Sequence, residues 1–424
     1  MAFLLDWFDF YAPTGPRDRM ASLYTGNGML TRRWFLGGLS GGLAASVLNV
    51  APEHFDVKSF DRTRVLRDAN RYLTEKPRTV TASISARSAG GKHDFFSEGD
   101  YWWPDPKNPD GPYIRRDGMS NPGNFDDHRK YLLAFSVRMP ALASTWVLTK
   151  DRRYSDQAIE HLNAWFVDPQ TRMNPNLQYA QAIHGRTTGR GTGIIDTIHL
   201  VEVARATQVL HAHGVLSANE FAPIKAWFAD YVNWMENSAN GKAERDAQNN
   251  HGTCWAMQIA SFATLTSDGE RQEAIRTRYR TALLPNQMAE DGSFPRELAR
   301  TKPYSYSLFN LEAMSAICQI LSRDTKDLWN FELADGRGMR RGLEFMAPYI
   351  RDKASWPKPA DVMYFKDWPM RESSLLFGSI AFDKPSYLDI WKTLPAESNV
   401  EEIIRNFFIR QPVLWVVVME SQKS

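Results

Sequence analysis

The chain has 424 residues, of which 43% are hydrophobic and 12% aromatic, so it can bury a large core and is not disordered. Its formal net charge is only +2, which excludes a general electrostatic affinity for nucleic acid. Two cysteines in apolar helical stretches, Cys254 and Cys318, favour buried thiols over a disulfide. The nine histidines show no metal-ligand spacing, and we expect neither a metal nor another cofactor.

Residues 1–52 are predicted to be a targeting region outside the fold. Arg32 and Arg33 precede a glycine- and alanine-rich run, residues 34–52, that contains no charge. Paired arginines before a weakly apolar run are typical of a twin-arginine export signal. The run falls short of the ~20 apolar residues that span a bilayer, so we expect no stable membrane anchor. The remaining residues, 53–424, are predicted to form one domain of a periplasmic protein.

After a predicted helix over Thr63–Leu73, residues 77–124 break the helical pattern. This aromatic loop is rich in glycine, proline and aromatic residues. A loop this long is usually functional or disordered, and its aromatic residues argue against disorder. Aromatic faces stack on sugar rings and guanidinium groups hold carboxylates, which favours a binding loop over a packed surface loop. The candidate binding residues of the loop are Tyr101, Trp102, Trp103, Arg115 and Arg116.

Two polar segments follow farther along the chain. Residues 185–193 are glycine-rich but lack the Gly-Lys-Ser/Thr ending of a phosphate loop, so a glycine-rich lead into the next helix is favoured. Amide and phenol groups just before them suit hydrogen bonds to sugar hydroxyls, with the polar face of a helix as an equal alternative. These residues are Asn176, Gln178, Tyr179 and Gln181.

From Phe125 onward, helical patterns dominate. Ser217 and Glu220 form a capping box before apolar residues spaced three or four apart, and Gly214 separates this helix from the preceding one at about 194–211. Roughly a dozen helices in succession, with few strands, predict an all-α fold, an incomplete α/α toroid of helical hairpins. The tail, residues 413–418, is strand-like, although a buried helix end explains it nearly as well.

Two segments carry the groups needed to remove a proton next to a carboxylate. Asn250 and His251 offer an amide and an imidazole, and Arg300 and Tyr306 offer a guanidinium and a phenol. Elimination requires donors on the substrate carboxylate, a base, and an acid for the departing oxygen. The first three groups suit the carboxylate, where charge grows in the transition state. Tyrosine suits the base and the acid, because nearby cations favour the phenolate despite a reference pKa of ~10.

Each of these residues also has a structural interpretation. Asn250 can cap a helix beside a hydrogen-bonded His251, at even odds, and the two converge on one ligand best from a helix start or a loop. Arg300 can pair with Glu297, three residues earlier, and Tyr306 can pack in the core, with Tyr304 as its rival. The combination of the four residues favours a shared site.

These motifs resemble the alginate lyase family of polysaccharide lyases. The resemblance runs from about Thr79 to Phe309, and is carried by residues 88–104, which include Lys92 and His93, and by 176–182, 249–251 and 297–300. It implies an α/α toroid that cleaves polyuronates by β-elimination, usually without a metal. Asn250, His251 and Arg300 would neutralise the carboxylate, with His251 as a possible base for one epimer, and Tyr306 would transfer protons.

The resemblance also implies that the aromatic loop is a lid over the cleft. One departure from the family is Tyr304-Ser305-Tyr306-Ser307, where family members that cut polymannuronate often end the segment in Tyr-His, so alginate and glucuronan both stay candidate substrates. Trp368 and Arg371 are candidates for a further wall of the site.

Two other functions remain open. A glycoside hydrolase on the same fold requires two opposed carboxylates. The candidate acids are Glu98, Asp100, Asp291 and Glu297, and their spacing in the sequence does not identify such a pair. A non-catalytic protein would bind the glycan without shortening it. In every case the expected partner is an acidic polysaccharide, and the sequence carries no signal for an oligomeric state.

Overall fold

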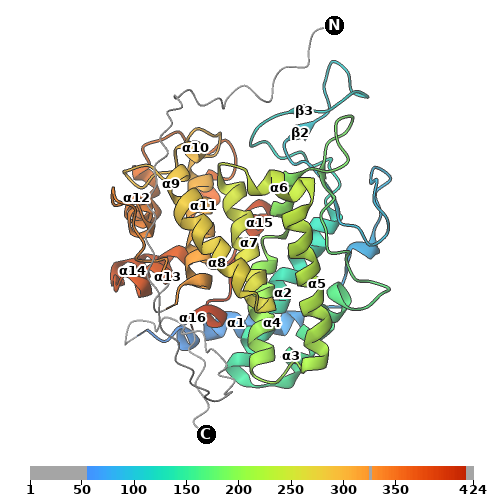
Figure 1. The fold of residues 1–424 in the computed structure, drawn as a ribbon, viewed down its shortest axis with the longest axis horizontal. Coiled ribbons are helices and arrows are strands. Elements are labelled where there is room, and N and C mark those ends of the chain that lie inside the picture. The colour runs from blue at the N-terminus through green and yellow to red at the C-terminus, as the bar shows by residue number, and fades with distance from the viewer. Residues whose placement is uncertain (1–54, 324–326, 417–424) are drawn as a thin grey trace, which may run out of the picture. The chain divides into compact units, whose positions relative to one another are not determined.

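The computed structural model describes residues 55–323 and 327–416, so the predicted export signal lies outside the described residues. All of the described residues belong to one compact unit. Helices dominate this unit, as predicted (Figure 1).

Helices of an inner series pack one against the next in chain order: α2 (Asp127–Thr149), α4 (Leu200–Ala212), α7 (Asn250–Thr266), α11 (Pro303–Leu321) and α13 (Ser373–Ala381). Outer helices come between or after them along the chain. Helix α3 (Arg152–Phe166) packs on α2, and α5 (Ala218–Asn237) and α8 (Gly269–Arg278) pack on α7. Helix α12 (Met339–Arg351) packs on α11, and α14 (Pro385–Thr393) packs on α13. This alternation of inner and outer helices is the predicted α/α toroid.

The remaining elements are short, apart from α1 (Val57–Tyr72), which packs on α2. The tail forms helix α16 (Val413–Val416) against α1, α2 and α4, so the helical alternative for the tail is the right one over the described residues. The other α-helices are α6 (Ala239–Arg245), α9 (Leu284–Gln287), α10 (Pro295–Leu298) and α15 (Glu401–Asn406). Short 3-10 helices are η1 (Val80–Ala82), η2 (Gly191–Thr197), η4 (Lys353–Ser355) and η5 (Phe365–Asp367), and η3 (Tyr279–Leu283) is a π-helical segment.

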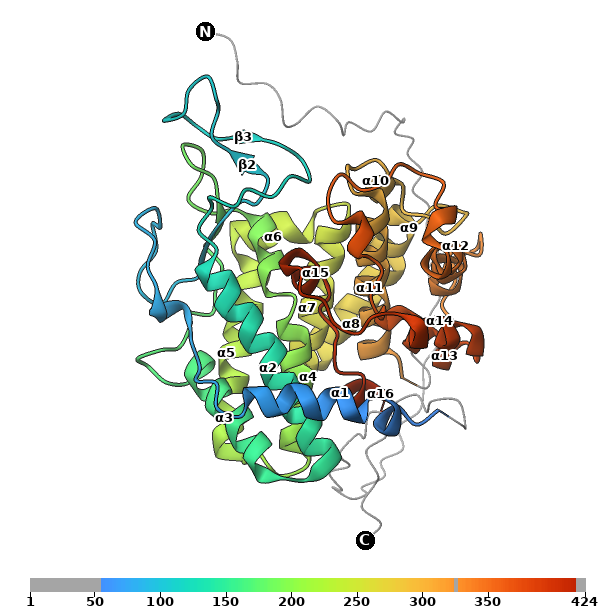
Figure 2. The same ribbon diagram turned by 180° about the vertical axis from the view of Figure 1, so that it is seen from behind.

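Four short strands tie the aromatic loop to the helices. Strand β1 (Phe96–Glu98) pairs in parallel with β4 (Tyr179–Ala182), and β2 (Trp102–Trp103) pairs antiparallel with β3 (Ile114–Arg115). Phe95 and Phe96 are buried, so the aromatic residues order this loop as expected. Both views show the β2–β3 hairpin at the same end of the helices as α6 and α10 (Figures 1 and 2).

Local sequence signals account for several helix boundaries. The capping box of α5 is present: the Ser217 hydroxyl accepts from the Glu220 amide at 3.3 Å, and Glu220 accepts from the Ser217 amide at 2.9 Å. Gly214 turns the chain between α4 and α5 with φ +70°, a conformation that favours glycine. By length and composition alone α2 would suit a membrane, but 67% of its apolar stretch is buried among the other helices, as in a core helix. Both cysteines are free and buried, as predicted.

Candidate active site

The four predicted catalytic residues lie at, or just before, the beginnings of two inner helices. Asn250 and His251 are the first two residues of α7, directly after α6. Arg300 lies between α10 and α11, and Tyr306 lies in the first turn of α11. The expectation that Asn250 and His251 sit at a helix start is therefore confirmed.

Asn250 is fixed by a buried carboxylate. Its backbone amide donates to Glu297 Oε1 and its side-chain Nδ2 donates to Glu297 Oε2, both at 2.7 Å. Burial raises the pKa of Glu297, which the two hydrogen bonds from Asn250 oppose. The Asn250 Nδ2 carries two hydrogens, and Glu297 accepts one of them, so the other can be donated to a ligand. Glu297 thus serves Asn250, and the salt bridge expected as an alternative for Arg300 is replaced by another partner.

His251 is held by a second buried carboxylate, which the sequence analysis missed. His251 Nδ1 lies 2.7 Å from Glu244 Oε1 on α6, and the His251 side chain stays 20% exposed. Because a carboxylate accepts, Nδ1 carries the proton and Nε2 is the nitrogen left for a ligand. The spacing of seven residues would place both side chains on one face of a continuous helix, but here α6 and α7 are separate helices.

Arg300 pairs with Asp117, another residue that the sequence analysis did not single out. Arg300 Nε and Nη2 donate to Asp117 Oδ2 and Oδ1 at 3.2 and 2.9 Å. The guanidinium carbon lies 4.6 Å from the centroid of the Tyr306 ring. The structure therefore brings Arg300 and Tyr306 together, as the sequence predicted.

Tyr306 shares a hydrogen bond with a tyrosine of the aromatic loop. The hydroxyls of Tyr306 and Tyr101 are 2.8 Å apart. Burial raises the pKa of Tyr306 to about 12, although the Arg300 charge and the Tyr101 hydrogen bond act to lower it. Burial also raises the pKa of Tyr101. Both phenols are consequently protonated at neutral pH, and the pair can pass a proton between them.

A buried charge network, here called the Asp100 network, lies beside the two phenols. Arg129 Nη1 donates to Asp100 at 2.8 Å, Arg405 also pairs with Asp100, and Lys302 Nζ lies 2.9 Å from Glu402. Burial opposes ionisation of Asp100, but Arg405 and Arg129 hold its pKa well below the usual range. The Lys302 ammonium also lies 5.3 Å from the Tyr101 ring centroid, which joins the network to the phenol pair.

The β2–β3 hairpin gathers aromatic and basic side chains, as predicted. Arg116 lies 4.9 Å from the Trp103 ring centroid. Trp102 is buried, and the Arg186 and Arg190 guanidinium groups lie 5.2 and 6.0 Å from its ring centroid. Trp102 therefore supports basic side chains, whereas the less buried Trp103 has a ring that a sugar can approach.

The segment of predicted amide donors forms a loop and strand β4, so the helical alternative is wrong. Asn176 Oδ1 accepts from the Gln178 amide at 3.1 Å, and the Gln178 side chain is exposed. Tyr179 is half-buried in β4. Gln181 is buried and accepts from Arg190 Nη2 at 2.8 Å, so it holds this arginine. A direct sugar contact thus remains open to the first three residues only.

Lys92 and His93 precede β1. The Lys92 side chain is exposed, and His93 Nδ1 lies 2.7 Å from the carbonyl oxygen of Arg172. His93 therefore connects two loops, and Lys92 is the one of the two with a free approach from solvent.

Two predicted binding residues need correction. Tyr304 is fully buried, its hydroxyl donates to the Tyr349 carbonyl at 3.1 Å, and its ring packs edge-on against Trp356. It is a core residue and not the rival of Tyr306. Arg371 Nη1 lies 3.2 Å from Asp61, and its guanidinium stacks 4.9 Å from the Trp391 ring centroid. It therefore joins the segment before α13 to α1 and α14 instead of walling the site.

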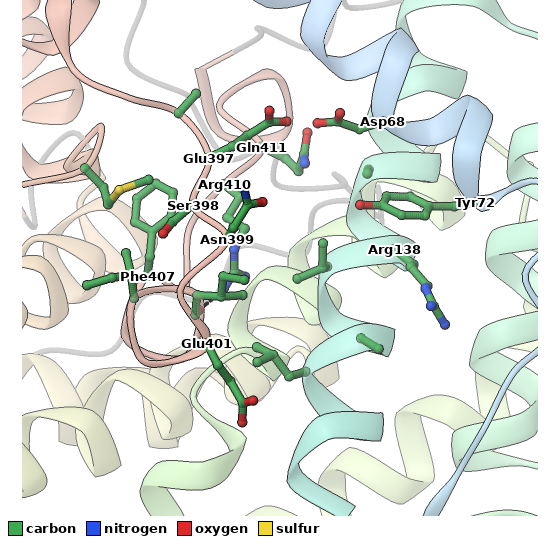
Figure 3. A pocket seen from close by; sticks show the side chains of 18 of the residues that line it. Asp68, Tyr72, Arg138, Glu397, Ser398, Asn399, Glu401, Phe407, Arg410 and Gln411 are labelled. Carbon is green, nitrogen blue, oxygen red and sulfur yellow. Dashed lines mark hydrogen bonds between the residues drawn. The ribbon is translucent and has the colours of Figure 1, made fainter. Parts of the chain in front are cut away.

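A separate cavity of about 400 Å³ lies between α1, α2 and residues 396–411. Asp68, Glu397 and Gln411 meet at one end of it, and the Tyr72 side chain points inward (Figure 3). None of the predicted site residues lines this cavity. Helix α15 separates it from the Asp100 network, because Glu401 lines the cavity whereas Glu402 and Arg405 belong to the network. Across residues 55–323 and 327–416, no cluster of three or more histidine, cysteine or acidic residues is placed to hold a metal ion.

Comparison with known proteins agrees with this architecture. A family model described as alginate lyase matches residues 79–356. Among solved structures, an alginate lyase from Bacteroides ovatus is 31% identical with a TM-score of 0.71, over 83% of this chain and 93% of that chain. A variant of alginate lyase A1-III of Sphingomonas species A1, in its apo form, is 14% identical with a TM-score of 0.50, over 88% of this chain and 95% of that chain, a likeness of fold alone. A search of curated proteins gave no match.

The fold and these matches define the molecule as a polysaccharide lyase built on an α/α toroid. Because the family model covers more than half of the sequence, the chain belongs to the alginate lyase family.

Proposed function

We propose that the protein cleaves a β-1,4-linked polyuronate, alginate or glucuronan, by β-elimination and leaves an unsaturated sugar at the new non-reducing end. The observation that carries this proposal is the arrangement around Tyr306. Its phenol meets a second phenol at 2.8 Å, and a guanidinium lies 4.6 Å from its ring centroid.

Recognition of the uronate carboxylate falls to the donors at the helix starts. Asn250 offers its second Nδ2 hydrogen, His251 offers Nε2–H when it is the imidazolium, and Arg300 offers the edge of the guanidinium that Asp117 leaves open. Withdrawing charge from the carboxylate acidifies the hydrogen on the adjacent carbon. Donors that are already oriented stabilise the developing negative charge without reorganisation in the transition state.

Proton transfer is assigned to Tyr306. At neutral pH only a small fraction of Tyr306 is ionised, because burial raises its pKa to about 12, and this phenolate takes the proton from the carbon next to the carboxylate. The electron pair of that bond forms the carbon–carbon double bond. The bond to the glycosidic oxygen breaks, and the phenol returns a proton to that oxygen. Arg300 favours the phenolate, which burial otherwise disfavours. For a substrate epimer whose proton lies on the opposite face, His251 is the alternative base.

The aromatic loop is proposed to act as a lid. It contributes Tyr101 to the phenol pair and Asp117 to Arg300, so it closes one side of the site. Trp103, with Arg116 beside it, offers a ring for stacking and a charge for a neighbouring uronate.

The lyase assignment is tested by incubating the purified protein with alginate and, separately, with glucuronan while following the ultraviolet absorbance of the new double bond. Tyr306→Phe is expected to lower kcat by about 10²–10⁴-fold, the usual contribution of a general acid–base group. Tyr304→Phe is the matched control, because that phenol donates to a backbone carbonyl in the core and should leave kcat within a few-fold. Unchanged activity of Tyr306→Phe would remove Tyr306 from the mechanism. New reducing ends without absorbance would indicate a hydrolase.

We also propose export through the twin-arginine pathway to the periplasm, on the strength of Arg32 and Arg33 before an uncharged run. Replacing both arginines by lysine should retain the protein in the cytoplasm, as measured by cell fractionation. Unchanged export would contradict this proposal.

A further inference from the structure

Asp117 is the point where the aromatic loop meets the proposed catalytic arginine. Its carboxylate accepts four hydrogen bonds: Arg300 Nε at 3.2 Å, Arg300 Nη2 at 2.9 Å, Arg115 Nη2 at 2.6 Å and Thr301 Oγ1 at 3.0 Å. Such charge-assisted, forked contacts fix the plane of a guanidinium as well as its position. One side chain of the loop therefore controls the orientation of Arg300.

A guanidinium presents two forked edges, one formed by Nε and Nη2 and the other by Nη1 and Nη2. Asp117 occupies the first edge of Arg300. Asp117 does not contact the second edge, and the guanidinium carbon lies 4.6 Å from the centroid of the Tyr306 ring. A lysine at position 300 would supply charge but neither edge.

We infer that Asp117 is a positioning residue: it aims the free edge of Arg300 at the uronate carboxylate, so the site is complete only when the β2–β3 hairpin is docked. This inference rests on the proposed function. It links closure of the aromatic loop to catalysis through a single carboxylate.

Further contacts hold the aromatic loop against the segment between α10 and α11. Trp103 Nε1 donates to the Met119 carbonyl at 2.8 Å, which closes the loop beyond β3. Gly118 has φ +76°, and a Cβ there would lie 2.5 Å from Thr301 Oγ1, so glycine permits the close approach.

The charges of the two arginines beside Asp117 also support a positioning role for this carboxylate. Arg115 and Arg300 share one oxygen of Asp117 and would repel each other without its charge. Loss of Asp117 therefore both frees Arg300 and loosens the hairpin.

The test is a double-mutant cycle on elimination kinetics. Asp117→Asn should lower kcat by roughly 10–100-fold with a change in KM below about threefold, because a misaimed donor mainly affects the transition state. In an Arg300→Lys background, where no fork remains to be aimed, the same substitution should cost less than about threefold. Equal losses in the two backgrounds, or a loss confined to KM, would overturn the inference.

Asp105→Asn is the matched control on the same hairpin, because the Asp105 carboxylate accepts from the Lys107 amide of its own turn, and the substitution should leave kcat unchanged. Thermal unfolding checks each variant, and Asp117→Glu replaces Asp117→Asn if the latter does not fold.

A second readout does not depend on activity. Trypsin should cut the hairpin at Lys107 faster in Asp117→Asn than in Asp105→Asn or the unmodified protein, since the hairpin is less firmly docked. Equal cutting rates would contradict the docking role. If the unmodified protein shows no elimination at all, the proposed function fails, and the cutting rates still decide whether Asp117 docks the hairpin.

Discussion

At the scale of single residues, buried acids orient the groups that meet the substrate. Glu297 holds Asn250 through two hydrogen bonds and Glu244 holds His251 through one. A carboxylate accepts only, so each one dictates which atoms of its partner remain free for the ligand. Both acids are almost fully buried and neither is offered to a substrate.

Glu297→Ala should destabilise the protein by about 1–3 kcal/mol, because the buried amide donors of Asn250 lose their acceptor. It should also lower kcat by releasing the Asn250 side chain. Urea unfolding and elimination kinetics measure the two effects. Glu290→Ala, at an exposed acid nearby in sequence, should change stability by less than about 0.5 kcal/mol. A stable and fully active Glu297→Ala would show that Asn250 does not depend on this contact.

At the scale of elements, the beginnings of α7 and α11 assemble the site. Buried acids accept the first amides of both helices: Asn250 N donates to Glu297, and Tyr304 N and Ser305 N donate to Asp361. The side chains at these starts, rather than the backbone amides, are therefore left to meet a substrate. The close approach of α7 to the preceding segment depends on Gly252, where a Cβ would lie 2.1 Å from the carbonyl oxygen of Ala247. Because that neighbour is backbone, it cannot move aside alone.

Gly252→Ala should therefore shift the start of α7, cost about 1–3 kcal/mol of stability and reduce kcat, although residue 252 is not assigned a contact with substrate. The control is Gly269→Ala at the start of α8, where a Cβ meets nothing within 4 Å. That variant should be neutral or gain up to about 1 kcal/mol. Unfolding curves measure the stability of the two variants, and equal stabilities would argue against a packing role for Gly252.

At the scale of the whole described unit, the Asp100 network joins parts of the chain that are far apart in sequence. Asp100 belongs to the aromatic loop, Arg129 to α2 and Arg405 to α15. All three are mostly or fully buried, so each charge depends on its partners.

Asp100→Ala should cost about 3–5 kcal/mol at neutral pH, the usual effect of leaving buried partners unpaired. The pKa of Asp100 is depressed in the folded protein, so its contribution is present above its unfolded pKa of about 3.9 and is lost as the pH falls. The stability difference from the unmodified protein should thus narrow below about pH 4. Asp110→Ala, at an exposed acid of the same loop, is the control in both pH ranges. A difference that stays constant with pH would contradict an ionised Asp100.

The choice between Tyr304 and Tyr306 shows where local pattern stops being informative. Residues two positions apart on a helix, such as these two tyrosines, point about 200° apart around the helix axis. One of the pair therefore faces the core when the other faces a cleft. The sequence identifies the pair, but the packing of Trp356 against Tyr304 decides which one is buried. Arg371 fails for a similar reason, because its partners Asp61 and Trp391 lie far away in the sequence.

The sequence by itself determined the helical fold, the capping box of α5 and the two buried thiols, and it named the four candidate site residues, because these depend on periodicity, turn chemistry and motifs within short segments. Only the tertiary structure decided the partners of those residues. Asp117, Glu244 and Glu297 act across separate elements, and a contact between separate elements leaves no periodic trace in the chain. Short sequence segments therefore indicated the kinds of chemical group in the candidate site, whereas the packing of the helices set the orientation of those groups and the charges beside them.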